Sequence, residues 1–316
     1  MSGSTAGFRR LSLAALAAAS LVVAACGSSA AAPTRAAAPT AAGFPVTLRM
    51  SSGTVTLRHR PARIVSLSPS ATEDLFALGA GRQVVAADSY STYPKRAPHT
   101  NLSAYHPNLE AIARYKPDLV VLSDDINHIA DQLGALHVPV LLEPPAASLA
   151  QLYAEIDQLG RATGHSSGAK NVVARMRRQI AAIVRSRPRP ATPLKVYHEL
   201  DQTYYSADSH TFIGQMYRLV GLENIADKAS GTSDYPQLSS EYIISADPDL
   251  IVLADTVCCG QSRATVAARP GWSQIAAVKT GMVVPVNDSI ASEWGPRIVL
   301  FLKAVSSAVK TLDAQQ

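Results

Sequence analysis

The chain of 316 residues has few of the residues that build disulfide-stapled or zinc-binding proteins. Its three cysteines, Cys26, Cys258 and Cys259, lack the paired spacing of a zinc ligand set. Its eight histidines are scattered, with no two at the spacing that places ligands on one helix face. No phosphate-binding loop occurs. We therefore expect that the protein is not an enzyme.

Charge and hydropathy exclude two further classes. The formal net charge is +5, a modest balance for this length, and the arginines between positions 175 and 189 have the pattern of a solvated helix face. We expect no nucleic-acid partner. Beyond residue 25 no apolar stretch is long enough for a membrane-spanning helix.

Residues 1–25 have the pattern of a leader peptide. Arg9 and Arg10 precede an apolar stretch that is too short to span a bilayer. Cys26 follows the small residues Val23-Ala24-Ala25, which resembles a bacterial lipobox. The resemblance implies a lipoprotein signal peptide over 1–25 and export to the outer face of the cytoplasmic membrane, with lipid on Cys26 as the only anchor. The alternative is an ordinary secretory signal.

Residues 26–43 are predicted to be a flexible tether. From position 27 to 43 the chain contains only Gly, Ser, Ala, Pro, Thr and one Arg, so it cannot bury enough apolar surface to fold.

Two stretches of the remaining chain repeat each other. Glu110 is followed after seven residues by Pro-Asp-Leu-Val-Val-Leu-Ser-Asp (117–124), and Glu241 by Pro-Asp-Leu-Ile-Val-Leu-Ala-Asp (248–255). Each copy predicts a helix near the glutamate and then a short buried strand. Two matching α/β units indicate two lobes with a cleft between them.

The order of elements gives the boundaries. An N-terminal lobe with a leading β-hairpin is predicted over 44–147, a helical segment between the lobes over 148–190, and a C-terminal lobe over 191–316. Strands that alternate with helices indicate largely parallel sheets with Rossmann-like connections, in which ligands meet the carboxyl ends of the strands.

Several ordered motifs resemble one family. Residues 63–73 (RIVSLSPSATE), 78–81 (LGAG), 88–94 (DSYSTYP), 236–241 (PQLSSE) and 295–297 (GPR) are similar to those of the cobalamin and iron-siderophore substrate-binding proteins of ABC importers. The resemblance covers about residues 60–312. It implies the class III substrate-binding protein fold, with a long interlobe helix, and a monomer that delivers a small-molecule metal chelate to a permease dimer with a cytoplasmic ATPase.

The same resemblance implies that Glu110 and Glu241 dock on that permease. Both follow predicted N-caps, Asn108 and Ser239 or Ser240. The alternative is a local role, in which each carboxylate stabilises the first turn of its helix through the helix dipole, and both roles can hold together.

The ligand is expected to lie among aromatic residues. The predicted binding residues are Tyr90, Tyr93, Tyr105, Tyr205, Tyr235, Trp294 and Arg297. Rings suit a bulky ring-shaped ligand, and positions 90, 105 and 235 match corrinoid contacts of the family, although two of these are commonly tryptophan there. The few arginines disfavour an anionic siderophore, whereas the hairpin is typical of siderophore receptors, so both ligands remain open.

Cys258 and Cys259 are adjacent thiols in an exported chain, and we hypothesise that they form a disulfide. No cofactor is expected besides the transported corrinoid or ferric chelate. The alternatives are a receptor for haem or a metal ion, with Tyr105, His106 and His198 as ligands, and, less favoured, an exported metal-dependent hydrolase.

Overall fold

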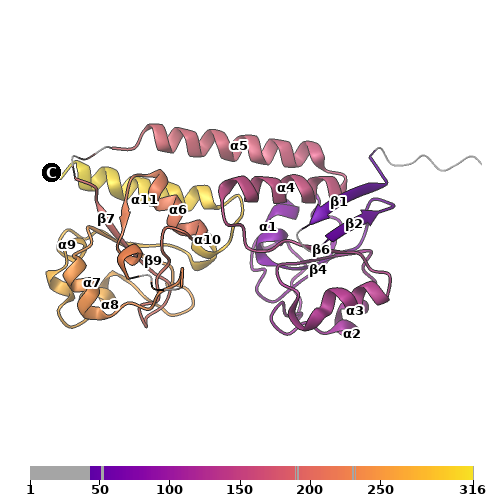
Figure 1. The fold of residues 1–316 in the computed structure, drawn as a ribbon, viewed down its shortest axis with the longest axis horizontal. Helices are drawn as coiled ribbons and strands as arrows, with labels where there is room; N and C mark the ends of the chain where they lie inside the picture. Colours follow the sequence, from indigo (N-terminus) through magenta and orange to yellow (C-terminus); the bar gives the residue numbers. More distant parts are fainter. Residues whose placement is uncertain are drawn as a thin grey trace, which may run out of the picture. The chain divides into compact units, whose positions relative to one another are not determined.

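The computed structural model describes residues 43–50, 53–188, 190, 192–229, 231 and 233–315. The predicted signal peptide, Cys26 and nearly all of the predicted tether lie outside the described residues. From residue 43 onward the chain contains two parallel sheets, each surrounded by helices (Figure 1).

The first sheet has the order β4-β3-β5-β6, with all strands parallel. Its strands are β3 (Ile64–Leu67), β4 (Val84–Ala87), β5 (Leu119–Leu122) and β6 (Val140–Leu142), and its helices are α1 (Pro69–Ala77), α2 (Leu109–Ala113), the 3-10 turn Ile126–His128 and α3 (Ile129–Ala135). The antiparallel hairpin of β1 (Val46–Met50) and β2 (Gly53–Leu57) precedes it, as predicted.

The second sheet has the order β10-β9-β7-β8 and is also parallel. Its strands are β7 (Lys195–Glu199), β8 (Glu223–Asn224), β9 (Leu250–Leu253) and β10 (Val283–Pro285). Its helices are α6 (Phe212–Leu219), α7 (Ser240–Ala246), α8 (Arg263–Ala267), α9 (Ala276–Lys279), α10 (Asp288–Ser292) and α11 (Ile298–Asp313), with 3-10 turns at Ile225–Lys228 and Trp272–Gln274.

The repeat in the sequence corresponds to one topology used twice. In each sheet the first strand in sequence lies between the second and the third, and the fourth lies beyond the third. The third strands, β5 and β9, are the apolar runs of the two motifs, and each pairs with the first strand of its sheet, β3 or β7. All four strands are almost completely buried because helices cover both faces. The predicted two-lobed α/β fold is confirmed.

The Pro-Asp pair of each motif has a structural role that the sequence did not reveal. The Asp118 carboxylate accepts the backbone N–H of Arg63 at 2.8 Å, and Asp249 accepts that of Lys195 at 2.7 Å. The Arg63 and Lys195 side chains in turn donate to carbonyls at the ends of α2 and α7. We call these pairs, Arg63–Asp118 and Lys195–Asp249, the strand clamps. Each fixes the amino end of its sheet.

Two helices connect the sheets. α4 (Leu149–Thr163) and α5 (Ser166–Arg185) are separated at Gly164, whose positive φ of 73° favours glycine. The predicted apolar stripe of α5, including Met176 and Ile180, is buried. α5 packs against α4 and then against α11, so it joins helices of both lobes (Figure 1).

Candidate functional site

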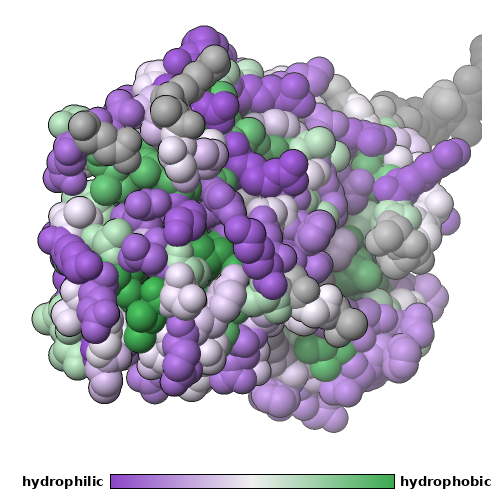
Figure 2. Space-filling view, turned by 60° about the vertical axis from the view of Figure 1, so that its left-hand side comes forward, coloured by the Kyte–Doolittle hydropathy of each residue, from purple (hydrophilic) through white to green (hydrophobic). Residues whose placement is uncertain are grey.

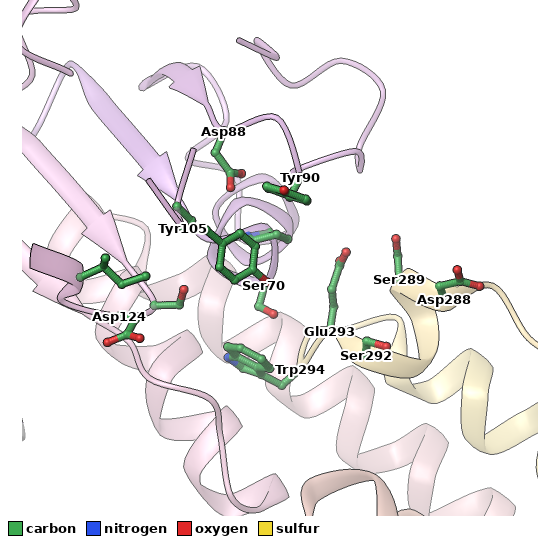
Figure 3. Close-up of a pocket in the computed structure, with 14 residues that line it drawn as sticks. Ser70, Asp88, Tyr90, Tyr105, Asp124, Asp288, Ser289, Ser292, Glu293 and Trp294 are labelled. Carbon is green, nitrogen blue, oxygen red and sulfur yellow. The ribbon is translucent and has the colours of Figure 1, made fainter. Parts of the chain in front are cut away.

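A cavity of about 320 Å³ lies at the carboxyl edges of the two sheets. Its N-terminal wall comes from the loops after β3, β4 and β5, and its C-terminal wall from the segment 288–294 after β10 (Figure 3). This is the edge where parallel α/β sheets bind ligands, because helix starts and connecting loops gather there. The cavity is therefore the main candidate for the binding site.

Three of the predicted aromatic residues line this cavity. Tyr90 and Tyr105 belong to the N-terminal lobe, and their rings meet edge-to-face with centroids 5.0 Å apart. Trp294 enters from the C-terminal lobe (Figure 3). Tyr90 is 52% and Tyr105 60% exposed, so large apolar surfaces remain available to a ligand.

A hydrogen-bond network fixes the loop that carries Tyr90. The buried Asp88 carboxylate accepts the Ser91 hydroxyl at 2.5 Å and its N–H at 3.0 Å, while Ser91 also bonds to Thr72 of α1 at 2.9 Å. The second Asp88 oxygen is buried without a partner among the described residues. Burial raises the pKa of Asp88 against the effect of the Ser91 bonds. Asp88 therefore holds the loop that carries Tyr90 and is itself shielded from solvent.

Carboxylates make up most of the charge around the cavity. Asp88 and Asp124 lie on the N-terminal wall, and Asp288 and Glu293 on the C-terminal wall, whereas no lining residue is Lys or Arg. Figure 3 shows Glu293 pointing into the space between the walls. Burial raises the pKa of Glu293 to about 7 although Arg297 opposes the shift. These acids are far apart in the sequence, and only the folded sheets bring them together as a set.

Arg297 lies beside the cavity and connects the two lobes. Its side chain and backbone N–H bond to Glu73 of α1 at 2.5 and 2.8 Å, and its guanidinium also bonds to Glu293 at 2.8 Å. It stacks over the ring of Tyr93 at 4.0 Å. A Cβ added to Gly295 would lie 3.0 Å from the Glu73 carboxyl, which explains the glycine before Pro296. Tyr93 and Arg297 line a separate surface hollow rather than the cavity itself.

The remaining predicted tyrosines lie outside the cavity lining. Tyr205 and Tyr235 are on neighbouring C-terminal-lobe segments, where Tyr205 forms an isolated bridge with Gln237. They are 41% and 54% exposed. The structure therefore brings Tyr90, Tyr105 and Trp294 together and leaves Tyr205 and Tyr235 on the surface.

Glu110 and Glu241 occupy equivalent places. Each is exposed in the first turn of a short helix, α2 or α7. The side chains of Asn108 and Ser239 cap these helices, as predicted, at 2.9 and 3.1 Å. The caps hold each glutamate at a defined place on its lobe.

Cys258 and Cys259 are joined by a disulfide in the structure. They lie in the exposed segment after β9, at the same edge of the sheet as the cavity. His198, in contrast, is buried in β7, where it bonds to the Tyr217 hydroxyl at 2.6 Å. Burial lowers the pKa of His198 to about 4, and the residue cannot reach a ligand in the cavity. The alternative that used His198 as a metal or haem ligand is wrong on this point.

Among the described residues that line the cavity, the serines have no histidine beside them that could serve as a base. Within the described ranges, Asp208, His210 and Asp234 have potential ligand atoms within 4.8 Å of one another, but they are elsewhere on the C-terminal lobe. The segment 164–168 (GHSSG) has the Gly-x-Ser-x-Gly spacing of a hydrolase elbow. It joins α4 to α5 instead of a strand to a helix. It therefore lacks the context that makes such a serine reactive.

The visible surface in Figure 2 has small hydrophobic patches between hydrophilic residues. None of the helices in the described part of the chain is both long and apolar enough to cross a bilayer.

Comparison with known proteins agrees with this architecture. A family model described as periplasmic binding protein matches residues 64–289. A cobalamin-binding protein of Halobacterium salinarum is 35% identical over 81% of this chain and 72% of its own. An uncharacterized ABC transporter substrate-binding lipoprotein of Bacillus subtilis is 30% identical over 94% of this chain and 95% of its own.

A solved structure with a similar fold is the periplasmic heme-binding protein of Roseiflexus sp. RS-1 in its apo form. It has a TM-score of 0.69 and 26% identity, over 79% of this chain and 98% of its own. The expectation that the protein is a solute receptor of the ABC-importer type, and not an enzyme, is confirmed. With two lobes of one topology, a cavity between them and a family match over most of the fold, the chain belongs to the periplasmic binding protein family.

Proposed function

We propose that this receptor captures a corrinoid of the cobalamin type and delivers it to an ABC importer. The observation that carries the proposal is the cavity lining, which combines the rings of Tyr90, Tyr105 and Trp294 with four carboxyl groups and no basic residue. Rings can contact the apolar face of a macrocycle, and carboxylates can accept hydrogen bonds from the amide side chains of a corrinoid.

The same lining disfavours anionic ligands. The carboxylates of haem and the anionic groups of ferric siderophores need nearby Lys or Arg, because an unpaired buried charge is costly. None of the residues that line the cavity supplies such a cation. A relative that is 35% identical is named a cobalamin-binding protein, which supports the same choice.

Isothermal titration with a ligand panel tests the proposal. The panel is cyanocobalamin, cobinamide, haem and a ferric catecholate siderophore, each added to the purified protein. We expect tight binding of at least one corrinoid, and a loss of about tenfold or more in affinity for Trp294→Ala, since a buried ring contributes more than 1 kcal/mol. Tight binding of haem or the siderophore with no binding of either corrinoid would refute the assignment.

We further propose that Glu110 and Glu241 dock on the two subunits of a permease dimer coupled to a cytoplasmic ATPase. Their equivalent exposure on the two lobes supports this role. Glu110→Lys and Glu241→Lys should each reduce uptake of labelled cyanocobalamin by cells that depend on this receptor, without changing corrinoid affinity. Asp313→Lys, a single reversal at the exposed end of α11, is the matched control. Uptake at the native rate in both glutamate variants would exclude docking through them.

We propose lipid attachment at Cys26 as the membrane anchor and a monomeric receptor. Mass spectrometry of the protein isolated from its native membrane should detect a diacylglyceryl modification on Cys26, and Cys26→Ser should release the protein into the soluble fraction. A membrane-bound Cys26→Ser variant would contradict this anchor.

A further inference from the structure

The segment that follows β9 carries an exposed apolar tip. Val257 is 70% exposed, and the next two residues, Cys258 and Cys259, are exposed and joined to each other by a disulfide. A disulfide between neighbours closes a small ring that presents two sulfurs and two methylene groups, none of which needs a hydrogen bond. Apolar groups held in solvent beside a cleft are typical of a binding surface.

A residue of the cavity holds this tip in place. The Asp288 carboxylate accepts the N–H of Val257 at 2.9 Å and that of Cys258 at 2.7 Å, and it also bonds to the Thr256 hydroxyl at 3.1 Å. Asp288 lines the cavity at the start of α10, and Figure 3 shows its carboxylate turned away from Trp294. The tip therefore lies directly beyond the cavity rim.

The other end of the segment is also fixed. Gln261 donates its N–H to the Asp255 carbonyl at 3.2 Å, and its side-chain oxygen accepts from Arg269 at 2.8 Å. Arg269 itself forms two 2.6 Å bonds with the buried Glu199 at the end of β7. Because both ends are anchored, the exposed tip is a preorganised surface, and binding there has a small ordering cost.

The size of the proposed ligand indicates that it reaches this surface. A cobalamin-type corrinoid, with its ring side chains and nucleotide, is larger than a cavity of about 320 Å³, so part of it must extend over the rim. In the sheet order β10-β9-β7, the segment after β9 lies next to the segment after β10 that forms the C-terminal wall. The exposed tip is thus the adjacent surface on that side.

We propose that Val257 and the Cys258–Cys259 disulfide form an apolar lip that contacts the part of the ligand extending from the cavity. This inference rests on the proposed corrinoid function. It adds a contact in the C-terminal lobe that is distinct from the rings of Tyr90, Tyr105 and Trp294 in the cavity lining.

Titration calorimetry with cyanocobalamin and cobinamide tests the lip. Val257→Ser keeps the disulfide, whereas Cys258→Ser with Cys259→Ser removes it, and Leu136→Ser changes an apolar residue with 50% exposure at the end of α3, away from the cavity lining. We expect the first two variants to bind about three- to tenfold more weakly, because each loses contact with roughly one to two methyl-sized groups. Leu136→Ser should bind as the native protein does.

The outcomes separate the two proposals. Native affinity in both lip variants, with corrinoid binding by the native protein intact, would refute the lip and leave the corrinoid assignment standing. No corrinoid binding by the native protein would refute both. Since Val257 is on the surface, its variant should fold as the native protein does, which circular dichroism checks.

Discussion

Replacing Arg297 by Gln should destabilise the protein far more than removing a surface charge. The Arg297 side chain is 15% exposed and is paired with Glu73, whose side chain is 2% exposed, and with Glu293. Breaking a buried pair by removing one partner costs about 3–5 kcal/mol, because the remaining charge is left without compensation. We expect about 3 kcal/mol, since Glu73 keeps the backbone N–H of residue 297 at 2.8 Å.

The loss should also depend on pH. Glu293 has a pKa of about 7 in the fold against an ordinary value of 4.5, so the folded state holds a proton that the unfolded chain releases, and its contribution to stability falls as pH rises from 4.5 to 7. Without Arg297 this pKa rises further. The difference between the native protein and the variant should therefore be largest near pH 8 and smaller at pH 5.

Urea unfolding at pH 8 and pH 5 measures both effects. Lys303→Gln removes an exposed charge from the same helix and should change the free energy of unfolding by less than about 0.5 kcal/mol. Adding Glu73→Gln to Arg297→Gln should recover part of the loss, because the buried charge is then gone. If the free energy of unfolding of Arg297→Gln at pH 8 lay within about 1 kcal/mol of the native value, this account of the pair would be refuted.

Two further predictions concern the N-terminal lobe. Burial raises the pKa of Glu143 to about 8 from 4.5, so the stability of the protein should fall between pH 4.5 and 8. Glu143→Gln should flatten the fall of the thermal midpoint over this range by an amount equivalent to roughly a few kcal/mol. An unchanged pH profile in this variant would contradict the assignment. Gly168→Ala would place a Cβ 1.9 Å from the Leu78 carbonyl oxygen, and it should lower the free energy of unfolding by about 2 kcal/mol. The control is Gly134→Ala on α3, where an added Cβ meets nothing within 4 Å, and it should be neutral or stabilising. Equal unfolding midpoints for the two variants would show that α5 does not approach the end of α1 this closely.

The sequence allowed the fold to be predicted because its strongest signals are local. The apolar runs of β5 and β9, the proline before each, and the caps Asn108 and Ser239 can all be recognised within a few residues. Tyr90 lies within the motif 88–94 and Trp294 directly precedes the motif 295–297, so both could be proposed as site residues, and Tyr105 could be proposed from the family resemblance.

The acidic lining could not be predicted in the same way. Asp88 and Glu293 are separated by about two hundred positions of chain, and only the packing of the two lobes makes them neighbours of one cavity. Nothing in the sequence indicates that the guanidinium of Arg297, a predicted ligand contact, pairs with Glu73 in the buried part of α1. Pairings across such sequence distances depend on tertiary packing, which has no local signal.

The strand clamps and the loops that surround the cavity lie at opposite ends of the strands in each lobe. Arg63–Asp118 and Lys195–Asp249 secure the amino ends of the sheets, far along the strands from the loops that surround the cavity. Substitutions in those loops thus leave the framework bonds untouched. A receptor of this design can acquire a new cargo by exchanging its loops, and the residues 88–94 and 256–260 are the segments with which an attempt to retarget it should begin.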